Sequence, residues 1–526
     1  MIPFYGGMNM LFTEQEKKII KLITCFYRNN GKWLKYNELV LYIGTSKKTL
    51  RSYIDRLHDL FFDLCEFDYT GSMVRVKFDS NFGLVTMQRI FLDKSLIVRI
   101  LKRTFFCDYK SKLDLAIDLN TSESSIFRAI QTLNNGLPDF YDLTFSYSKL
   151  QFEGSESEIQ KFYVNLFIET NPDPLYWPFE DFMREEEANA FARHITNYVQ
   201  NSIYPDQFEY IKVVLAVASI RLKKSHKISI SPTDDDLYQK IEELAKKPEI
   251  SAFLERFFPE FRANKTFTAY QIVSYFLNEE FFFFFYDLDY RLKNFMKAKA
   301  NYEFYLKKIS FLQKKYNLEI PDPLDFYKDL ATFFRFKISN VDAEDFFLDH
   351  SEYSLNYLKF FNIDFHNDLK IFLTEYMCRF YPKAQHKVQD LIYTVYTLWP
   401  NLIPQLIKAQ SVTKALIVSR YDQYYARTLA DLINTMSPNY IHADVYGNFQ
   451  IDFEEIKNSD YEVIITDFVV KKDFGDKLIF SFEQLPLLSK IRDFFYKIHY
   501  MKINKVFQAH PDELKKFANF LGYKND

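Results

Sequence analysis

The chain has 526 residues, of which 26% are charged and 48% hydrophobic, and its formal net charge is −3. A chain of this length is expected to form several domains with buried cores. Because the net charge is slightly negative, any nucleic-acid binding has to come from a local basic patch. The chain holds only 11 glycines and lacks the phosphate-binding motifs G-x-G-x-x-G and G-x-x-x-x-G-K-[ST], which argues against a nucleotide-binding fold.

The cysteines and the N-terminus indicate a cytoplasmic protein. The four cysteines lack C-x-x-C spacing, which favours reduced thiols over a disulfide framework or a zinc site. The first residues lack the basic region and the apolar run of a signal peptide. The run FFFFF at 281–285 is too short to span a membrane, and we expect it in a buried helix.

A repeated segment near the N-terminus predicts two recognition helices. Residues 43–57, IGTSKKTLRSYIDRL, align with residues 119–133, LNTSESSIFRAIQTL, when shifted by 76 positions. Each copy begins with a Thr-Ser pair that suits a helix N-cap, and apolar residues then recur every three or four positions as one buried stripe. A shorter helical segment precedes each copy, at 36–44 and 112–120, so each copy reads as helix-turn-helix.

Each copy is followed by a predicted hairpin. Residues 67–78 alternate apolar and basic side chains after a turn that contains glycine, and residues 140–152 alternate and then turn near Ser148-Lys149. Helix-turn-helix followed by a hairpin is a winged helix. Two winged helices in tandem favour DNA binding. The alternative is that these winged helices dock a protein and that the exposed face of each helix is simply solvated.

The exposed residues of the two copies differ in charge. Residues 1–80 carry 12 Lys/Arg against 9 Asp/Glu, whereas residues 81–160 carry 9 against 10, so the first copy is expected to dominate DNA affinity. We expect Arg51 to contact guanine and the lysines to contact phosphates. The DNA-binding candidates are Ser46, Lys47, Lys48, Thr49, Arg51, Ser52, Arg75 and Lys77 in the first copy and Ser124 and Arg128 in the second.

The middle of the chain, from about 156 to 408, has a helical pattern without a catalytic constellation. Its histidines have neither H-x-x-x-H nor H-x-x-E spacing, so we predict no metal site, no cofactor and no enzymatic activity. After about residue 412, apolar strands alternate with helices, which predicts an α/β domain with a largely parallel sheet. Ligands of such sheets lie beyond the carboxyl ends of the strands, here the loop 419–425 and Thr466-Asp467.

These parts, in this order, resemble the Mga-type regulators of Gram-positive bacteria. The resemblance rests on the two helix-turn-helix segments, on LAVASIRLKKSHKI at 215–228 and on ALIVSRYDQYYARTLADLI at 415–433. It implies a mainly α, multidomain fold: winged helix-turn-helix domains at 1–82 and 83–156, and helical phosphotransferase-system regulation domains (PRD) at 157–295 and 296–410. An α/β domain resembling phosphotransferase enzyme IIB is implied at 411–526.

The resemblance also implies a function. Members of the family regulate transcription, often as activators of virulence or metabolic genes, and self-associate through their C-terminal parts. The chain is therefore expected to be a homodimer that binds double-stranded promoter DNA, the alternative being a scaffold that docks proteins. By position, His194, His226 and His386 are candidates for phosphorylation by the phosphocarrier protein of the sugar phosphotransferase system, with His386 preferred over His350 and His366.

One departure from enzyme IIB matters. Where a cysteine-type enzyme IIB has its nucleophile after the first strand, this chain has Ser419 and Arg420, and no cysteine follows Cys378. The C-terminal domain is therefore expected to serve dimerisation or docking, without thiolate chemistry.

Overall fold

A computed structural model describes a large part of the chain. The described residues are 11–79, 83–139, 141–171, 173, 176–197, 205–229, 235–259, 264–273, 292–293, 296–320, 322–323, 325–326, 329–330, 354–355, 358–408, 412–420, 422–436, 440–471, 474–482, 490–491, 493–495, 497–498 and 501–502. The phenylalanine run at 281–285 lies outside them. The described residues fall into two compact units, one up to residue 293 and one from residue 296 onward.

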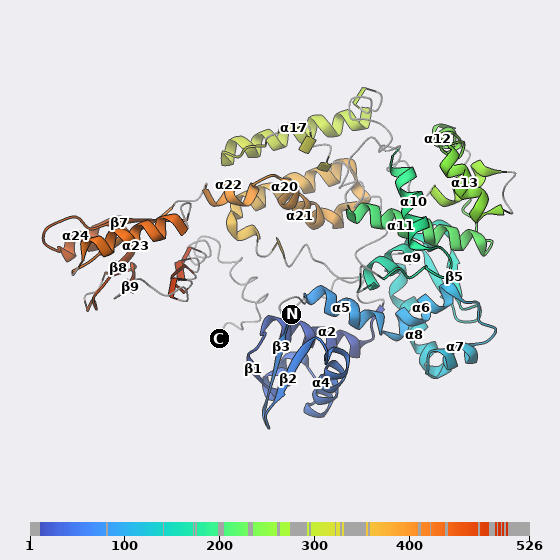
Figure 1. Cartoon of the computed structure of the whole chain (residues 1–526), viewed down its shortest axis with the longest axis horizontal. Coiled ribbons are helices and arrows are strands. Elements are labelled where there is room, and N and C mark those ends of the chain that lie inside the picture. The colour runs from blue at the N-terminus through green and yellow to red at the C-terminus, as the bar shows by residue number, and fades with distance from the viewer. Residues whose placement is uncertain are drawn as a thin grey trace. The chain divides into compact units, whose positions relative to one another are not determined.

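The first unit begins with three helices and a small sheet (Figure 1). The helices are α2 (Glu14–Arg28), α3 (Tyr36–Ile43) and α4 (Lys47–Phe61). Strands β2 (Cys65–Tyr69) and β3 (Met73–Phe78) form the predicted hairpin, and β1 (Trp33–Lys35) joins the other edge of β3. Leu50, Ile54 and Leu57 are buried, which confirms the apolar stripe of the recognition helix.

The second copy repeats the helix-turn-helix and the hairpin, but two helices precede them and its described residues contain no counterpart of β1. Helices α5 (Leu84–Asp93) and α6 (Leu96–Phe106) lead to α7 (Lys112–Asp118) and α8 (Glu123–Gly136). Strands β4 (Leu143–Ser146) and β5 (Gln151–Gly154) pair antiparallel and confirm the second hairpin. Ile126, Ile130 and Leu133 are buried along α8.

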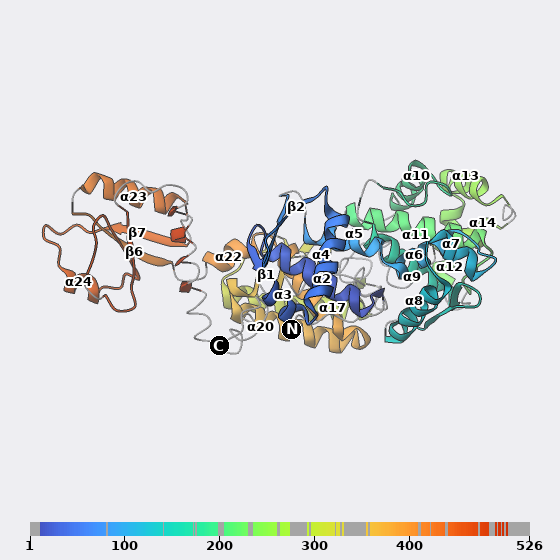
Figure 2. The ribbon, with the colours of Figure 1, turned by 90° about the horizontal axis from the view of Figure 1, so that it is seen from below.

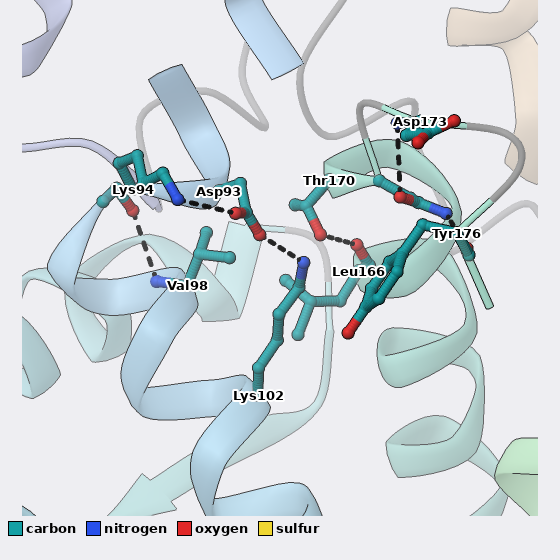
Figure 3. Close-up of polar contacts among 10 residues, drawn as sticks. Asp93, Lys94, Val98, Lys102, Leu166, Thr170, Asp173 and Tyr176 are labelled. Carbon is teal, nitrogen blue, oxygen red and sulfur yellow. Dashed lines mark hydrogen bonds and ion pairs between the residues drawn. The ribbon is translucent and has the colours of Figure 1, made fainter. Parts of the chain in front are cut away.

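Helix α9 (Glu156–Thr170) follows β5 directly and packs beside the second copy. Figure 3 shows the region where α5, α6 and α9 meet. Lys102 of α6 donates to Asp93 at the end of α5 over 2.7 Å, and its Nζ lies 6.0 Å from the ring centroid of Phe167 in α9. Burial lowers the pKa of Lys102, but the ion pair with Asp93 opposes that effect. One lysine thus ties three helices together.

The rest of the first unit is helical, as predicted. It contains α10 (Glu185–Thr196), α11 (Pro205–Lys223), α12 (Asp235–Ala245), α13 (Pro248–Phe257) and α14 (Lys265–Val273). A single buried cluster runs from Leu11 to Ile272. The predicted domain boundaries at 82 and 156 lie inside this common core and stay predictions.

The second unit begins with helices α17 (Met296–Tyr316), α20 (Ile363–Phe380), α21 (Val388–Leu398) and α22 (Leu402–Lys408). Short 3-10 helices lie at Lys359–Phe361 and Pro382–Lys387. Aromatic side chains form much of their core: the ring centroid of Phe365 lies 5.8 Å from Tyr396 and 6.0 Å from Trp399. The high phenylalanine and tyrosine content is used here for helix-to-helix packing.

The C-terminal part confirms the predicted parallel sheet. Its strands are β6 (Thr413–Val418), β7 (Ile441–Val445), β8 (Val463–Thr466) and β9 (Leu478–Ser481), in the order β7-β6-β8-β9, all parallel. Helix α23 (Gln423–Met436) buries Leu429 and Ile433 against one face, and α24 (Phe453–Asn458) buries Ile456 toward the other (Figure 2). After β6 the chain first adds β7 on one side of it and then crosses over to add β8 on the other side, so the switch point lies at the carboxyl ends of β6 and β8.

Candidate nucleic-acid interface

The turn before α4 is set by local chemistry. Gly44 adopts a left-handed backbone with φ 69°, which ends α3, and the Thr45 amide donates back to the Val40 carbonyl over 3.2 Å. Ser46 is the N-cap of α4: its Oγ accepts from the Thr49 amide over 3.1 Å and contacts the Thr49 hydroxyl at 2.8 Å. The hydroxyls of Ser46 and Thr49 are therefore used mainly to start the helix.

The next residues carry charge into solvent. Lys47, Lys48, Arg51 and Ser52 are exposed, while Leu50 and Tyr53 face the core. The Arg51 guanidinium and the Lys47 ammonium lie 5.6 Å and 5.9 Å from the ring centroid of Tyr36. Among the described residues, neither Lys47, Lys48 nor Arg51 has a carboxylate within ion-pair distance. The first two turns of α4 therefore present three cations on one exposed face.

The cations of the hairpin are placed differently. Arg75 donates to Asp68 Oδ2 over 2.7 Å and 2.9 Å and lies 4.9 Å from the ring centroid of Trp33. Lys77 pairs with Glu66 at 3.3 Å on the same strand pair. Both project from the central strand β3, away from buried Val74 and Val76, and each has a carboxylate beside it. Their part in DNA binding stays a prediction, and α4 is the better-placed source of positive charge.

The second copy presents a different face. Ser122 caps α8 by accepting from the Ser125 amide over 3.2 Å, and its hydroxyl also contacts Ser124 at 2.9 Å. Arg128 is exposed, and its Nε donates to the Ser124 carbonyl over 3.2 Å. The exposed residues of the first two turns are Glu123, Ser124, Phe127 and Arg128, as predicted.

Cations from the preceding helix hold both turns, a feature that sequence reasoning missed. Lys18 of α2 donates to the Gly44 carbonyl over 2.9 Å and Lys21 donates to the Tyr42 carbonyl over 2.6 Å. In the second copy, Arg99 of α6 donates to the Leu119 carbonyl over 3.0 Å. These contacts satisfy carbonyls at the end of the first helix of each motif, where the helix dipole favours positive charge. Basic residues on one face of the preceding helix are a weak signal of this arrangement.

The comparisons with known proteins bear on the same elements. Residues 80–167 match the Mga helix-turn-helix domain, a range that contains α5, α6, α7, α8 and the hairpin β4–β5. The chain is also 22% identical over 503 residues to a protein of Streptococcus pneumoniae serotype 4 that is provisionally named as a trans-acting regulator, covering 90% of this chain and 96% of that one. The chain thus contains an Mga helix-turn-helix domain and is similar, along most of its length, to a protein named as a trans-acting regulator.

A second relative of this chain is the anthrax toxin expression trans-acting positive regulator of Bacillus anthracis. It is 23% identical over 218 residues, which cover 40% of this chain and 44% of the relative. The match to the pneumococcal protein thus spans most of both chains, whereas the match to the anthrax regulator spans a part of each.

Among the candidate histidines of the chain, His226 has the most informative surroundings. It follows α11, where its amide donates to the Arg221 carbonyl over 3.0 Å, and it borders a cavity of about 590 Å³. The other walls are β5, the first turn of α9 and residues up to Ser229. Burial first, and then the positive charge of Arg221, lower the pKa of His226. His226 therefore lies where the second hairpin meets the helical region.

Two of the residues that line this cavity, Glu156 and Arg221, form a buried ion pair. Arg221 donates to both carboxylate oxygens of Glu156 over 2.9 Å and 2.5 Å, and both side chains are almost inaccessible to solvent. Glu156 is the first residue of α9, the helix that continues from the second hairpin. The pair therefore joins α9, which follows the second hairpin, to α11 through a bidentate contact.

The other histidines are less informative. His194 is half-buried near the end of α10, and His366 is buried with its ring centroid 6.0 Å from that of Tyr396. The backbone of His386 lies in the 3-10 helix Pro382–Lys387, but its side chain and all of His350 lie outside the described residues. Within the described residues of the first unit, no recorded contact joins His194 to His226.

At the carboxyl edge of the C-terminal sheet, the carboxylate of Asp467 lies beside the loop that begins at Ser419. Ser419 donates to Asp467 Oδ2 over 2.5 Å, and the Arg420 amide donates to Asp467 Oδ1 over 3.0 Å. Asp422 caps α23 by accepting from the amides of Tyr424 and Tyr425. Donors that could face an anionic ligand are thus already used by carboxylates of the chain itself.

Metal centres and membrane spans are both missing from the described residues. No group of three His, Cys, Asp or Glu side chains in the described ranges is arranged to hold a metal ion. Within those same ranges, no helix has the length and apolar character needed to cross a membrane.

Proposed function

We propose that this protein binds double-stranded DNA through α4 and α8 and controls transcription, as an activator of virulence or metabolic genes. The observation that carries the proposal is the exposed trio Lys47, Lys48 and Arg51 on the first two turns of α4. Helices of this kind enter the major groove with their N-terminal residues toward the bases. The anthrax relative is named as a positive regulator of toxin expression, which supports activation as the mode of control.

The contacts follow from the chemistry of the three side chains. Arg51 has a planar guanidinium that can donate to O6 and N7 of a guanine, whereas Lys47 and Lys48 are compact charges suited to phosphates. The ring of Tyr36 lies close to the cationic groups of Arg51 and Lys47. Its electron-rich face attracts both cations and so helps to hold them at the surface of α4. Ser124 and Arg128 of α8 would add contacts from a face that also carries the negative Glu123. Affinity should therefore depend more on α4 than on α8.

DNA binding is tested with the full-length protein and a library of random duplexes. Enrichment of one sequence class, bound more tightly than a scrambled duplex and less tightly at high salt, is the expected result. Recovery of no preferred sequence, together with a salt-independent and negligible affinity, would contradict the proposal. The alternative role, a scaffold that uses its winged helices to dock proteins, would then be the better interpretation.

We further propose that phosphorylation of histidines in the helical regions modulates this activity, with His194, His226 and His386 as acceptors and a phosphocarrier protein as donor. The phosphoryl group would leave a histidine of the carrier and form a new P–N bond to the acceptor ring. At His226 it would add negative charge within a cavity that Glu156 and Arg221 border. Since phosphate oxygens pair well with arginine, such a group would compete with Glu156 for Arg221 and loosen the joint between α9 and α11.

This step is tested by incubating the protein with the general phosphotransferase components and mapping phosphohistidine by mass spectrometry. Label on His226 that disappears in His226→Ala, with altered DNA affinity after labelling, is expected. A protein that acquires no phosphohistidine would rule out this mode of regulation while leaving DNA binding intact.

For the C-terminal α/β part, we propose a role in homodimerisation or docking, in a fold like enzyme IIB. Large apolar side chains are exposed in the connections that follow three neighbouring strands: Tyr424 in the first turn of α23 after β6, Phe449 in the loop after β7 and Val469 in the loop after β8. In a parallel sheet these connections share one edge. Sedimentation of Val469→Lys beside the unmodified protein tests the dimer: a shift toward monomer supports it, and an unchanged distribution contradicts this edge as the interface.

A further inference from the structure

The two recognition helices differ at one equivalent position. The shift of 76 residues that relates the two copies places Phe127 of α8 where Arg51 stands in α4. Both positions are the fifth residue of their helix, after the N-caps Ser46 and Ser122. Both side chains are exposed, and that of Phe127 is 48% accessible although it is aromatic. A large apolar ring thus occupies the position from which Arg51 would reach a base.

The ring of Phe127 is held in place from the hairpin. Its centroid lies 5.2 Å from that of Tyr147, with the two planes at 78°, the edge-to-face arrangement that aromatic pairs favour. Tyr147 follows β4, and on it lies Lys112 Nζ of α7, 4.5 Å from the ring centroid. The hairpin residue Tyr147 therefore contacts both Phe127 of α8 and Lys112 of α7. Such support reduces the conformational entropy that the side chain gives up when it binds.

The surroundings of Phe127 on α8 are polar. Its exposed neighbours on the helix are Glu123, Ser124, Arg128 and Gln131. A protein-docking face would be expected to continue as an apolar patch along the helix, whereas a groove-reading face combines one apolar contact with polar and basic ones. Lys112, whose ammonium group lies over the ring of Tyr147, adds a cation suited to a phosphate.

We propose that Phe127 determines sequence specificity in the second winged helix by packing its ring against the C5-methyl group of a thymine. The thymine methyl is the apolar group that the major groove presents, and phenylalanine is among the side chains that contact it. The two helices would then read different bases, a guanine by Arg51 and a thymine by Phe127. This inference rests on the proposed DNA binding.

The test uses the full-length protein and the duplex selected from the random library. Each thymine is replaced in turn by deoxyuridine, which removes the methyl group and leaves base pairing intact. At one thymine, the affinity of the unmodified protein should fall about three- to fivefold, the factor for burying one methyl group. Phe127→Ala should bind the thymine and deoxyuridine duplexes equally, and Phe127→Leu should keep part of the discrimination.

Phe62→Ala is the matched control, because Phe62 is 63% exposed just after α4, outside the first turns of either recognition helix. It should discriminate as the unmodified protein does. Specific binding with equal affinity for every deoxyuridine duplex, or discrimination that persists in Phe127→Ala, overturns the inference. A change in self-association of Phe127→Ala without any effect of deoxyuridine would assign the ring to protein docking instead. If the unmodified protein binds the selected duplex no more tightly than a scrambled duplex, the proposed DNA binding itself is refuted. This comparison is therefore made before any deoxyuridine duplex is tested.

Discussion

Gly44 and Asn120 occupy the same position in the two helix-turn-helix segments and both have left-handed backbone, with φ 69° and 49°. The hydrogen bonds around them repeat as well: the Thr45 amide donates to Val40 over 3.2 Å, and the Thr121 amide donates to Ala116 over 2.9 Å. Glycine adopts this conformation without steric cost, and asparagine tolerates it better than most residues. The two turns are thus the same structure built with different residues.

The left-handed backbone of Gly44 predicts that Gly44→Ala lowers stability more than Gly71→Ala does. Gly44→Ala should destabilise the first segment by about 1 kcal/mol, since a left-handed conformation is unfavourable for alanine. The space around Gly44 is open, so the effect would come from the backbone alone. Gly71→Ala is the control, because Gly71 has equally open space and no left-handed φ. Hydrogen exchange of the α3 and α4 amides measures both, and equal protection in the two variants would contradict the explanation.

The lysines of α4 should control the salt dependence of DNA binding. The double variant Lys47→Ala, Lys48→Ala is expected to weaken binding to all duplexes and to reduce the slope of log K against log salt by about 2, roughly one for each phosphate that a lysine no longer neutralises. Lys246→Ala, which removes an exposed lysine just after α12, should leave the slope unchanged. Titrations at several salt concentrations decide the matter, and a slope that stays the same in the double variant would remove the lysines from the interface.

Arg51 should instead control sequence preference. Replacing single guanines of the selected duplex by 7-deazaguanine removes the N7 acceptor of a bidentate contact. At one position this should lower the affinity of the unmodified protein, within the roughly 5- to 150-fold range of such a contact. Arg51→Ala should bind both duplexes alike. If the variant still distinguishes them, the guanine contact comes from another side chain.

His226 should make the stability of the first unit depend on pH. Its pKa is lowered by burial and by the charges of Arg221 and Lys224, while Glu156 and Asp108 act in the opposite direction. The unfolded chain therefore binds a proton at a higher pH than the folded chain does, so stability falls as the pH drops through the ordinary histidine value of about 6.5. The Tm should decrease less in His226→Gln than in the unmodified protein between about pH 7.5 and about pH 5.5. His442→Gln, which changes an exposed side chain on β7, serves as the control, and parallel Tm curves for His226→Gln and the unmodified protein would show that this proton has no effect.

The local features of this protein were predictable from its sequence. The N-caps Ser46 and Ser122, the buried stripes of α4 and α8, both hairpins and the parallel sheet all appeared where residue patterns placed them. Capping and side-chain periodicity act between residues a few positions apart, so their signals are present in any short window of sequence.

The tertiary structure decided which distant residues meet. The three-residue strand β1 is too short to have a pattern of its own and becomes a strand by pairing with β3. Lys18 and Arg99 support the turns, Arg221 binds Glu156 at the joint, and Asp467 accepts from Ser419, 48 positions away. Each of these pairs forms because packing of the apolar faces brings two separate elements together, and a charged side chain at a helix edge then takes whichever partner that packing supplies. The sequence alone thus determined the elements and the likeness of the two recognition helices, whereas packing decided that α4 keeps its cations exposed while the cations of β3 are paired.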